Sequence, residues 1–220
     1  MRPPSRAELR WYAVARALVA GFCAVFWRVS VTGAEHVPNE GPFVLAPVHR
    51  SYVDTLFCGC VTRRRLRFMG KDSLWNHTWS GRLVSSLGAF PVHRGSVDRE
   101  ALRASEEAIR NGEPVVIYPE GERKSGPMVH PLRDGAAFVA ARTGVPIVPV
   151  AIGGSEWAMP KGARFFRPVK VAIAVGPPIP APARAEGARV PRRHVAEVSD
   201  ALHAELQRLF DQALTDAGRR

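Results

Sequence analysis

The chain has 220 residues, of which 46% are hydrophobic and 23% charged. This length fits one domain with or without an appendage, and the composition excludes disordered, collagenous, coiled-coil and multi-span membrane proteins. The formal net charge of +11 at pH 7 predicts anionic partners: nucleic acid, an anionic membrane surface or phosphorylated substrates. Cys23, Cys58 and Cys60 match neither a disulfide framework nor a metal-site spacing, which favours a reducing cytosol.

Residues 6–28 are predicted to form a helix with a bulky apolar stripe. The stripe consists of residues that share an arc of roughly 80° at helical spacing: Trp11, Val14, Leu18, Phe22 and Val25. This helix could pack on the domain, lie in a membrane interface, or act as a span or signal peptide. The interface is favoured, because basic residues stand beside Trp, Phe and Leu and the apolar run is too short to span comfortably.

We therefore expect residues 1–28 to be a membrane-docking helix on the cytoplasmic face of the cell membrane, peripheral or monotopic. Four bulky side chains would reach the headgroup region: Trp11, Leu18, Phe22 and Trp27. Three arginines would meet anionic lipid: Arg6, Arg10 and Arg28.

Residues 29–220 are predicted to form one α/β domain, with a central, mostly parallel or mixed sheet flanked by helices. Short apolar runs are the candidate strands: Phe43–Val48, Leu66–Met69, Pro114–Tyr118, Ile147–Ile152 and Val169–Val175. Between them, one helix is expected to begin at Ser96 or Asp98 and end at Asn111, and another covers Gly135–Arg142. A proline-rich connection then leads to a long amphipathic helix over His194–Ala217 that docks on the sheet.

His49 directly follows the apolar run Phe43–Val48, and Asp54 comes five residues later. Open α/β sheets bind ligands where their strands end. A carboxylate on one imidazole nitrogen fixes the tautomer and leaves the other nitrogen as a general base. The sequence offers no Ser or Cys in a nucleophile elbow, so the pair would activate a substrate hydroxyl. By itself the spacing also fits a histidine that merely caps or packs.

Three further stretches follow in order. The first is Gly88–Gly95, which ends in Arg94 and a glycine; the second, Val116–Arg123, carries Pro-Glu-Gly; the third, Val145–Val150, is punctuated by prolines. With the His-x4-Asp motif, they resemble the four blocks of the glycerolipid acyltransferase family, closest to the 1-acyl-glycerol-3-phosphate acyltransferases. The resemblance spans the middle half of the chain.

The resemblance implies roles for particular residues. His49 would be the base and Asp54 would orient it, while Arg94 would bind the acceptor phosphate. Glu120 and Gly121 would shape the acceptor site, and Arg123 matches the arginine of the third block. It also implies acyl-CoA or acyl carrier protein as donor substrate, with no cofactor and no metal.

This chain departs from the family's third block, where Tyr118 replaces Phe, Glu122 replaces Thr and Lys124 replaces Ser. Simpler readings also stay open: Arg94, Arg123 and Lys124 as solvated charges, and Glu120-Gly121 as an ordinary turn. The run Arg63–Arg65 could be solvated or could touch lipid headgroups.

The expected function is transfer of a fatty acyl group to the free hydroxyl of 1-acyl-glycerol-3-phosphate, which makes phosphatidic acid. One alternative keeps the chemistry and changes the acceptor to glycerol-3-phosphate or a lyso-aminolipid. A different class, a basic nucleic-acid-binding module, would explain the charge but not the four blocks.

Overall fold

The computed structural model describes residues 4–92, 98–160, 162–182 and 190–219. Within them, seven strands form one sheet in the order β1-β7-β6-β2-β5-β3-β4. Neighbouring strands run parallel except β6 and β7, which are antiparallel. The strand bounds are β1 Ser30–Thr32, β2 Val44–Pro47, β3 Arg67–Lys71, β4 Ala89–Val92, β5 Val115–Val116, β6 Ile147–Gly153 and β7 Ala172–Val175. The predicted mostly parallel or mixed sheet is confirmed.

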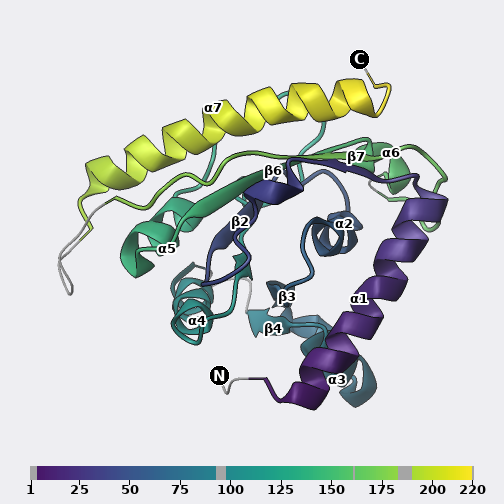
Figure 1. Ribbon diagram of the computed structural model, residues 1–220, viewed down its shortest axis with the longest axis horizontal. Helices are drawn as coiled ribbons and strands as arrows, with labels where there is room; N and C mark the ends of the chain where they lie inside the picture. The colour runs from purple at the N-terminus through teal and green to yellow at the C-terminus, as the bar shows by residue number, and fades with distance from the viewer. Residues whose placement is uncertain (1–3, 93–97, 161, 183–189, 220) are drawn as a thin grey trace.

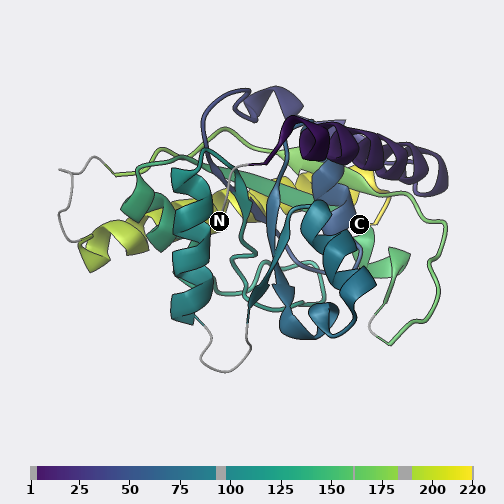
Figure 2. The ribbon, with the colours of Figure 1, turned by 90° about the horizontal axis from the view of Figure 1, so that it is seen from below.

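Helices cover both faces of this sheet. Their bounds are α1 Arg6–Phe26, α2 Asp54–Val61, α3 Thr78–Ser86, α4 Asp98–Arg110, α5 Gly135–Thr143, α6 Ser155–Ala158 and α7 Arg192–Asp216, with 3-10 turns at Ala34–His36 and Asp72–Trp75. Helices α4, α5 and α7 pack next to one another on one face, and α1 packs across α2 and α3 on the other (Figures 1 and 2).

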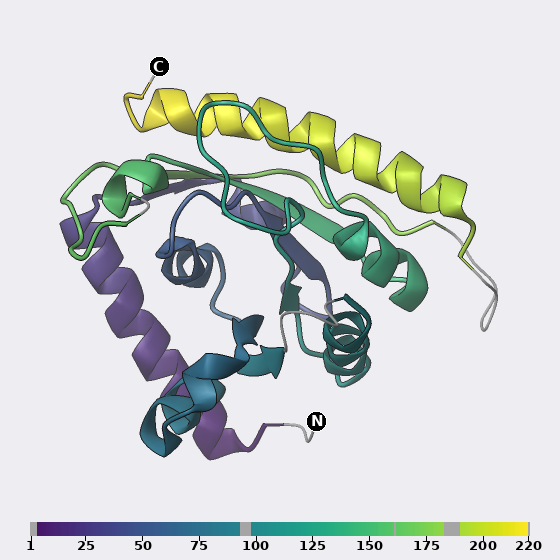
Figure 3. The same cartoon turned by 180° about the vertical axis from the view of Figure 1, so that it is seen from behind.

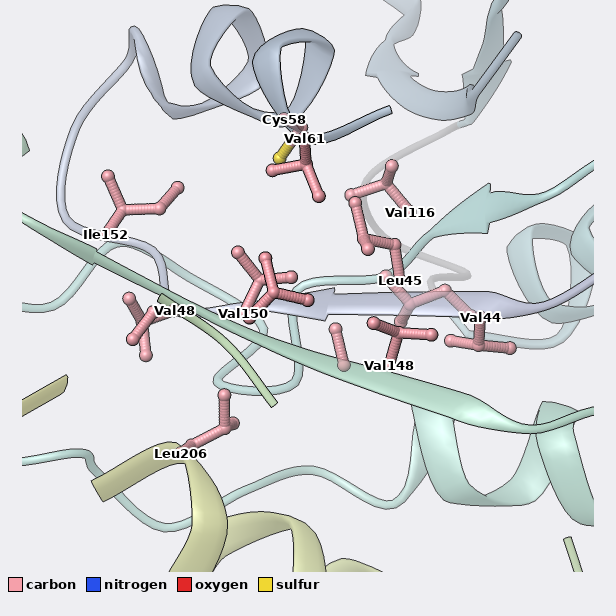
Figure 4. Packing of buried hydrophobic residues seen from close by; sticks show 14 of the residues in the cluster. Val44, Leu45, Val48, Cys58, Val61, Val116, Val148, Val150, Ile152 and Leu206 are labelled. Carbon is pink, nitrogen blue, oxygen red and sulfur yellow. The ribbon is translucent and has the colours of Figure 1, made fainter. Parts of the chain in front are cut away.

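The core lies on both sides of the central strands β2 and β6, which are buried along their whole length. Strands covered on both faces have no polar side, which is why these read as continuous apolar runs. Figure 4 shows Cys58 and Val61 of α2 on one side of the two strands and Leu206 of α7 on the other. The buried stripe of α7 matches the predicted amphipathic helix: Val195, Val198, Leu202, Leu206, Leu209 and Leu214.

Helix α1 turns its bulky stripe away from the domain. It begins with a capping box, in which Ser5 Oγ accepts from the Glu8 N–H and the Glu8 carboxylate from the Ser5 N–H. Tyr12 and Cys23 face the protein and are buried. The five stripe residues Trp11, Val14, Leu18, Phe22 and Val25 remain between 45% and 83% exposed. By length and composition alone, α1 is one helix that could cross a membrane.

Trp27 corrects one expectation, because it is fully buried and does not reach the headgroup region. The helix ends at Phe26, so Trp27 leaves the helical wheel and the chain turns inward toward β1. Its ring contacts Phe57 and Phe166 edge to face, and its Nε1 donates to the carbonyl oxygen of Arg167 at 3.0 Å. Trp27 therefore anchors α1 to the domain.

Candidate active site

A hydrogen-bonded His–Asp pair lies where β2 ends. His49 follows that strand and Asp54 is the first residue of α2, so the intervening turn brings the two side chains together. His49 Nδ1 lies 2.8 Å from Asp54 Oδ2, and the same oxygen accepts the backbone N–H groups of Arg50 and Ser51, each at 2.7 Å. Asp54 is fully buried, whereas the His49 side chain is 19% exposed. With Nδ1 directed at Asp54, Nε2 is the ring nitrogen left for substrate.

The imidazole of His49 stacks on Tyr118, with ring centroids 4.0 Å apart and planes 22° from parallel. The Tyr118 hydroxyl lies 3.2 Å from Thr55 Oγ1 and 3.9 Å from Cys58 Sγ, both on α2. Burial is the main cause that raises the pKa of Tyr118 well above its ordinary value, so the phenol stays neutral. The Tyr118 hydroxyl thus links the segment that follows β5 to the helix that carries Asp54. Sequence reasoning noted the substitution of Tyr for Phe but not this stacking.

Glu120 faces the interior. Its Oε2 accepts from Arg50 Nη1 at 2.6 Å and from the His49 backbone N–H at 3.1 Å, and its Oε1 accepts from the His130 N–H at 3.0 Å. Arg50 Nη2 also donates to the Met128 carbonyl oxygen at 2.9 Å. The buried ion pair therefore joins the turn that carries His49 to the long loop after β5, which Figure 3 shows passing beside α7. In this geometry Glu120 positions the His49 backbone, and its role in shaping the acceptor site stays a prediction.

The rest of the third block lies across the same turn. Gly121 has φ +74°, a left-handed conformation that favours glycine, and a Cβ there would displace the flexible Arg133 side chain. The Arg123 guanidinium lies over the Tyr52 ring, 3.2 Å from its centroid. The Lys124 backbone N–H donates to the His49 carbonyl oxygen at 2.9 Å. Arg123 is thereby held next to the residues that flank His49.

Arg94 lies outside the described residues. Strand β4 ends at Val92, and its parallel pairing with β3 puts its carboxyl end at the same edge of the sheet as that of β2.

An apolar pocket of about 230 Å³ lies between α1, α2, α3 and the strands β3 and β4. Thr55, which bonds to Tyr118, is part of its wall. Most of its lining is apolar and includes Ala15, Val19, Leu56, Gly59, Met69 and Leu87. The pocket thus begins one side chain away from the ring that stacks on His49.

Within the described ranges, no group of three or more His, Cys, Asp and Glu residues is placed to hold a metal ion. The site combines a histidine, a buried carboxylate hydrogen-bonded to its ring and a nearby apolar pocket, at the carboxyl edge of an α/β sheet. A histidine held in this way can remove the proton of a substrate hydroxyl, whose oxygen can then accept an apolar group without a nucleophile from the enzyme.

Comparison with known proteins names the class. The family model described as Acyltransferase matches residues 28–153, which is more than half of the chain, and the chain belongs to this family of enzymes.

The relatives agree on one activity. The chain is 28% identical over 183 residues to the 1-acyl-sn-glycerol-3-phosphate acyltransferase of Bacillus subtilis, covering 82% of this chain and 87% of that protein. It is 29% identical over 142 residues to a chloroplastic enzyme of the same name from Brassica napus, covering 62% of this chain and 40% of that one. The crystal structure of the 1-acyl-sn-glycerophosphate (LPA) acyltransferase PlsC from Thermotoga maritima superposes with a TM-score of 0.72 at 25% identity, over 95% of this chain and 83% of that one.

Proposed function

We propose that this acyltransferase moves a fatty acyl group from an acyl thioester, acyl-CoA or acyl carrier protein, to the free hydroxyl of 1-acyl-glycerol-3-phosphate. The products are phosphatidic acid and the free thiol. The observation that carries the proposal is the His49–Asp54 hydrogen bond inside the segment that matches the family. The printed activities of the relatives support this acceptor.

In the proposed reaction, His49 Nε2 takes the proton of the acceptor hydroxyl while its oxygen attacks the thioester carbonyl. Asp54 stabilises the imidazolium that forms. The tetrahedral oxyanion then collapses, the C–S bond breaks, and the leaving sulfur receives the proton from the imidazolium. The N–H groups of Arg50 and Ser51 already donate to Asp54, so they are not the oxyanion donors.

We assign the acceptor phosphate to Arg94 and Arg123, because guanidinium groups bind phosphate bidentately. The Tyr52 ring holds the Arg123 guanidinium in place through a cation–π contact. Arg94→Ala should raise the KM for the lysolipid by about 10- to 100-fold and leave the KM for the thioester nearly unchanged. Steady-state kinetics with each substrate varied in turn measures this. An equal loss for both substrates would make Arg94 structural.

The pocket between α1 and α2 is proposed to hold an acyl chain, since it is apolar and begins beside Tyr118. Such lipid substrates reside in bilayers. We therefore propose that the exposed stripe of α1 docks the enzyme on the cytoplasmic face of the membrane as a peripheral or monotopic protein.

Mass spectrometry of the products tests the proposed reaction. Purified protein is incubated with 1-acyl-glycerol-3-phosphate and a panel of acyl-CoA and acyl carrier protein thioesters, with glycerol-3-phosphate and a lyso-aminolipid as competing acceptors. We expect phosphatidic acid as the main product, and its loss in His49→Ala. Acylation of a competing acceptor in preference to the lysophosphatidate would replace the proposed acceptor. Undiminished turnover in folded His49→Ala would contradict the proposed role of His49 as the base.

A further inference from the structure

Two exposed apolar segments at opposite ends of α1 have no part in the function proposed so far. One is the aromatic loop Arg164–Arg167 between α6 and β7, where Phe165 is 81% exposed. The other is the outer face of α3, where Trp79 is 72% exposed and Leu83 lies four residues further along, on the same face. Large aromatic side chains this exposed signal a binding surface when they join a larger apolar patch.

Both segments are attached to α1 next to its exposed stripe. At its carboxyl end, Phe22 contacts Trp27 with centroids 5.2 Å apart, and Trp27 contacts Phe166 at 5.4 Å. The Trp27 indole also holds the Arg167 carbonyl oxygen, which fixes the aromatic loop to the end of the helix. The buried Trp27 ring, in contact with both Phe22 and Phe166, therefore holds the aromatic loop next to the carboxyl end of the stripe.

At the other end, α3 lies beside the first half of α1 (Figure 1). Trp11 Nε1 donates to Ser86 Oγ at 3.0 Å. Ser86 is three residues from Leu83 and seven from Trp79, so all three share one face of α3. The stripe thus extends onto α3 through Trp11.

The charges on these segments point to an anionic lipid surface. Arg164 and Arg167 flank the two phenylalanines and are exposed, and exposed Arg82 lies between Trp79 and Leu83 on α3. Aromatic rings with adjacent arginines suit the boundary between acyl chains and headgroups, where each basic residue contributes about 1 kcal/mol with anionic lipid.

We propose that the aromatic loop and the outer face of α3 join α1 in a three-part docking surface for an anionic bilayer. This rests on the proposed function, in which the acceptor is a membrane lipid. A single interfacial helix can roll about its axis, whereas contacts at both of its ends fix the plane of the protein. The orientation of the protein on the membrane affects the active site, because Ser51 lies two residues after His49. Its Oγ donates to the carbonyl oxygen of Met159, five residues before the aromatic loop. The pocket is also lined from both sides, by Val19 of α1 and Val84 of α3.

The test uses the full chain and flotation with vesicles of phosphatidylcholine and phosphatidylglycerol. Phe165→Glu and Trp79→Glu should each lower the apparent affinity about tenfold, the loss expected for one large apolar side chain no longer buried. Ala196→Glu is the matched control, since it adds the same charge to an exposed position of α7 on the opposite face of the sheet. Arg164→Gln with Arg167→Gln should weaken binding to these vesicles and leave binding to pure phosphatidylcholine unchanged.

Turnover separates this proposal from the proposed function. With a short-chain lysophosphatidate dissolved as monomers, Phe165→Glu and Trp79→Glu should keep wild-type turnover, and with vesicle-borne substrate they should lose it. Flotation equal to that of Ala196→Glu for both variants would overturn the docking surface, whatever the activity. A wild-type protein that floats but acylates no lysophosphatidate would overturn the proposed function alone. If a glutamate variant melts early, Phe165→Ser and Trp79→Ser remove the rings without adding a charge and are judged by the same outcomes.

Discussion

Two buried carboxylates hold His49 from different sides. Asp54 acts on the ring, and its Oδ2 gathers three donors, the imidazole and two backbone N–H groups. Glu120 acts on the backbone, through the His49 N–H and the guanidinium of Arg50. Since both are shielded from water, neither side chain can relax toward solvent when a partner is removed. Loss of the Asp54 charge should lower kcat, and loss of the partner of Glu120 should lower the free energy of unfolding.

Asp54→Asn should lower kcat about 10²- to 10⁴-fold with the protein still folded. The amide oxygen can take the place of Oδ2 and keep the three hydrogen bonds, but it lacks the charge that stabilises the imidazolium. Single-turnover kinetics and a thermal melt measure the two effects. A kcat within a few-fold of wild type would show that Asp54 only shapes the turn.

We expect the Arg50–Glu120 pair to contribute mainly to the stability of the fold. Arg50→Met leaves the Glu120 carboxylate buried without its cation, which costs about 3–5 kcal/mol of the free energy of unfolding. Adding Glu120→Gln to Arg50→Met should recover part of that loss, since no charge is then stranded. Urea unfolding of the wild type, both single variants and the double variant gives the coupling energy. Additive losses would contradict a coupled pair.

At the scale of elements, the sequence predicted the helices and strands whose apolar period is strong. The expected helices Gly135–Arg142 and His194–Ala217 match α5 and α7 within two residues. Strand β4 was not predicted, because it is short and contains Pro91; it lies at the edge of the sheet, where proline is tolerated. Helix α3 was missed because serines and Gly81 weaken its propensity. The glycine is required there, since a Cβ would lie 2.9 Å from the Trp75 ring.

The contacts within the active site also differ in how far the sequence could predict them. His49 and Asp54 are only five residues apart, so the turn after β2 can bring them together; the contact was predicted from this spacing together with the other three motif blocks, and the structure shows it. The partners of Glu120 could not be predicted, since Arg50 is 70 residues away and only the folded loop after β5 brings them together. The stacking of Tyr118 on His49 likewise depends on the pairing of β5 with β2.

Helix α2 offers a direct test of the pocket. A Cβ at Gly59 would meet only Arg16 Cγ, at 3.9 Å, so the position accepts a side chain without backbone strain. Gly59→Leu should fill part of the cavity and shift the preferred donor to shorter acyl chains, with the kcat/KM for the longest chains falling at least tenfold. Gly59→Ala is the matched control and should shift the preference little. Competition among acyl-CoA chain lengths measures the shift; an unchanged preference in Gly59→Leu would place the acyl chain elsewhere.

For the whole molecule, the net charge and the apolar stripe of α1 act over different ranges. A formal charge of +11 attracts the protein to anionic membranes over a Debye length of about 10 Å at 0.1 M salt, which shrinks to about 3 Å at 1 M. Apolar contacts are not screened in this way. Binding to anionic vesicles should therefore have a part that salt removes and a part that salt leaves.

Leu18→Asp with Val25→Asp separates these two parts. Both side chains are highly exposed, so the fold should survive, whereas deletion of residues 1–28 would remove Cys23 and Trp27 from the core. We expect the double variant to lose about a hundredfold in affinity at 1 M salt, because two apolar anchors are gone, and to keep the salt-sensitive attraction at low salt. Ala196→Asp with Ala204→Asp on α7 carries the same net charge and serves as the control. If the two double variants bind equally at high salt, α1 is a covering helix of the domain and the membrane must be met by another surface.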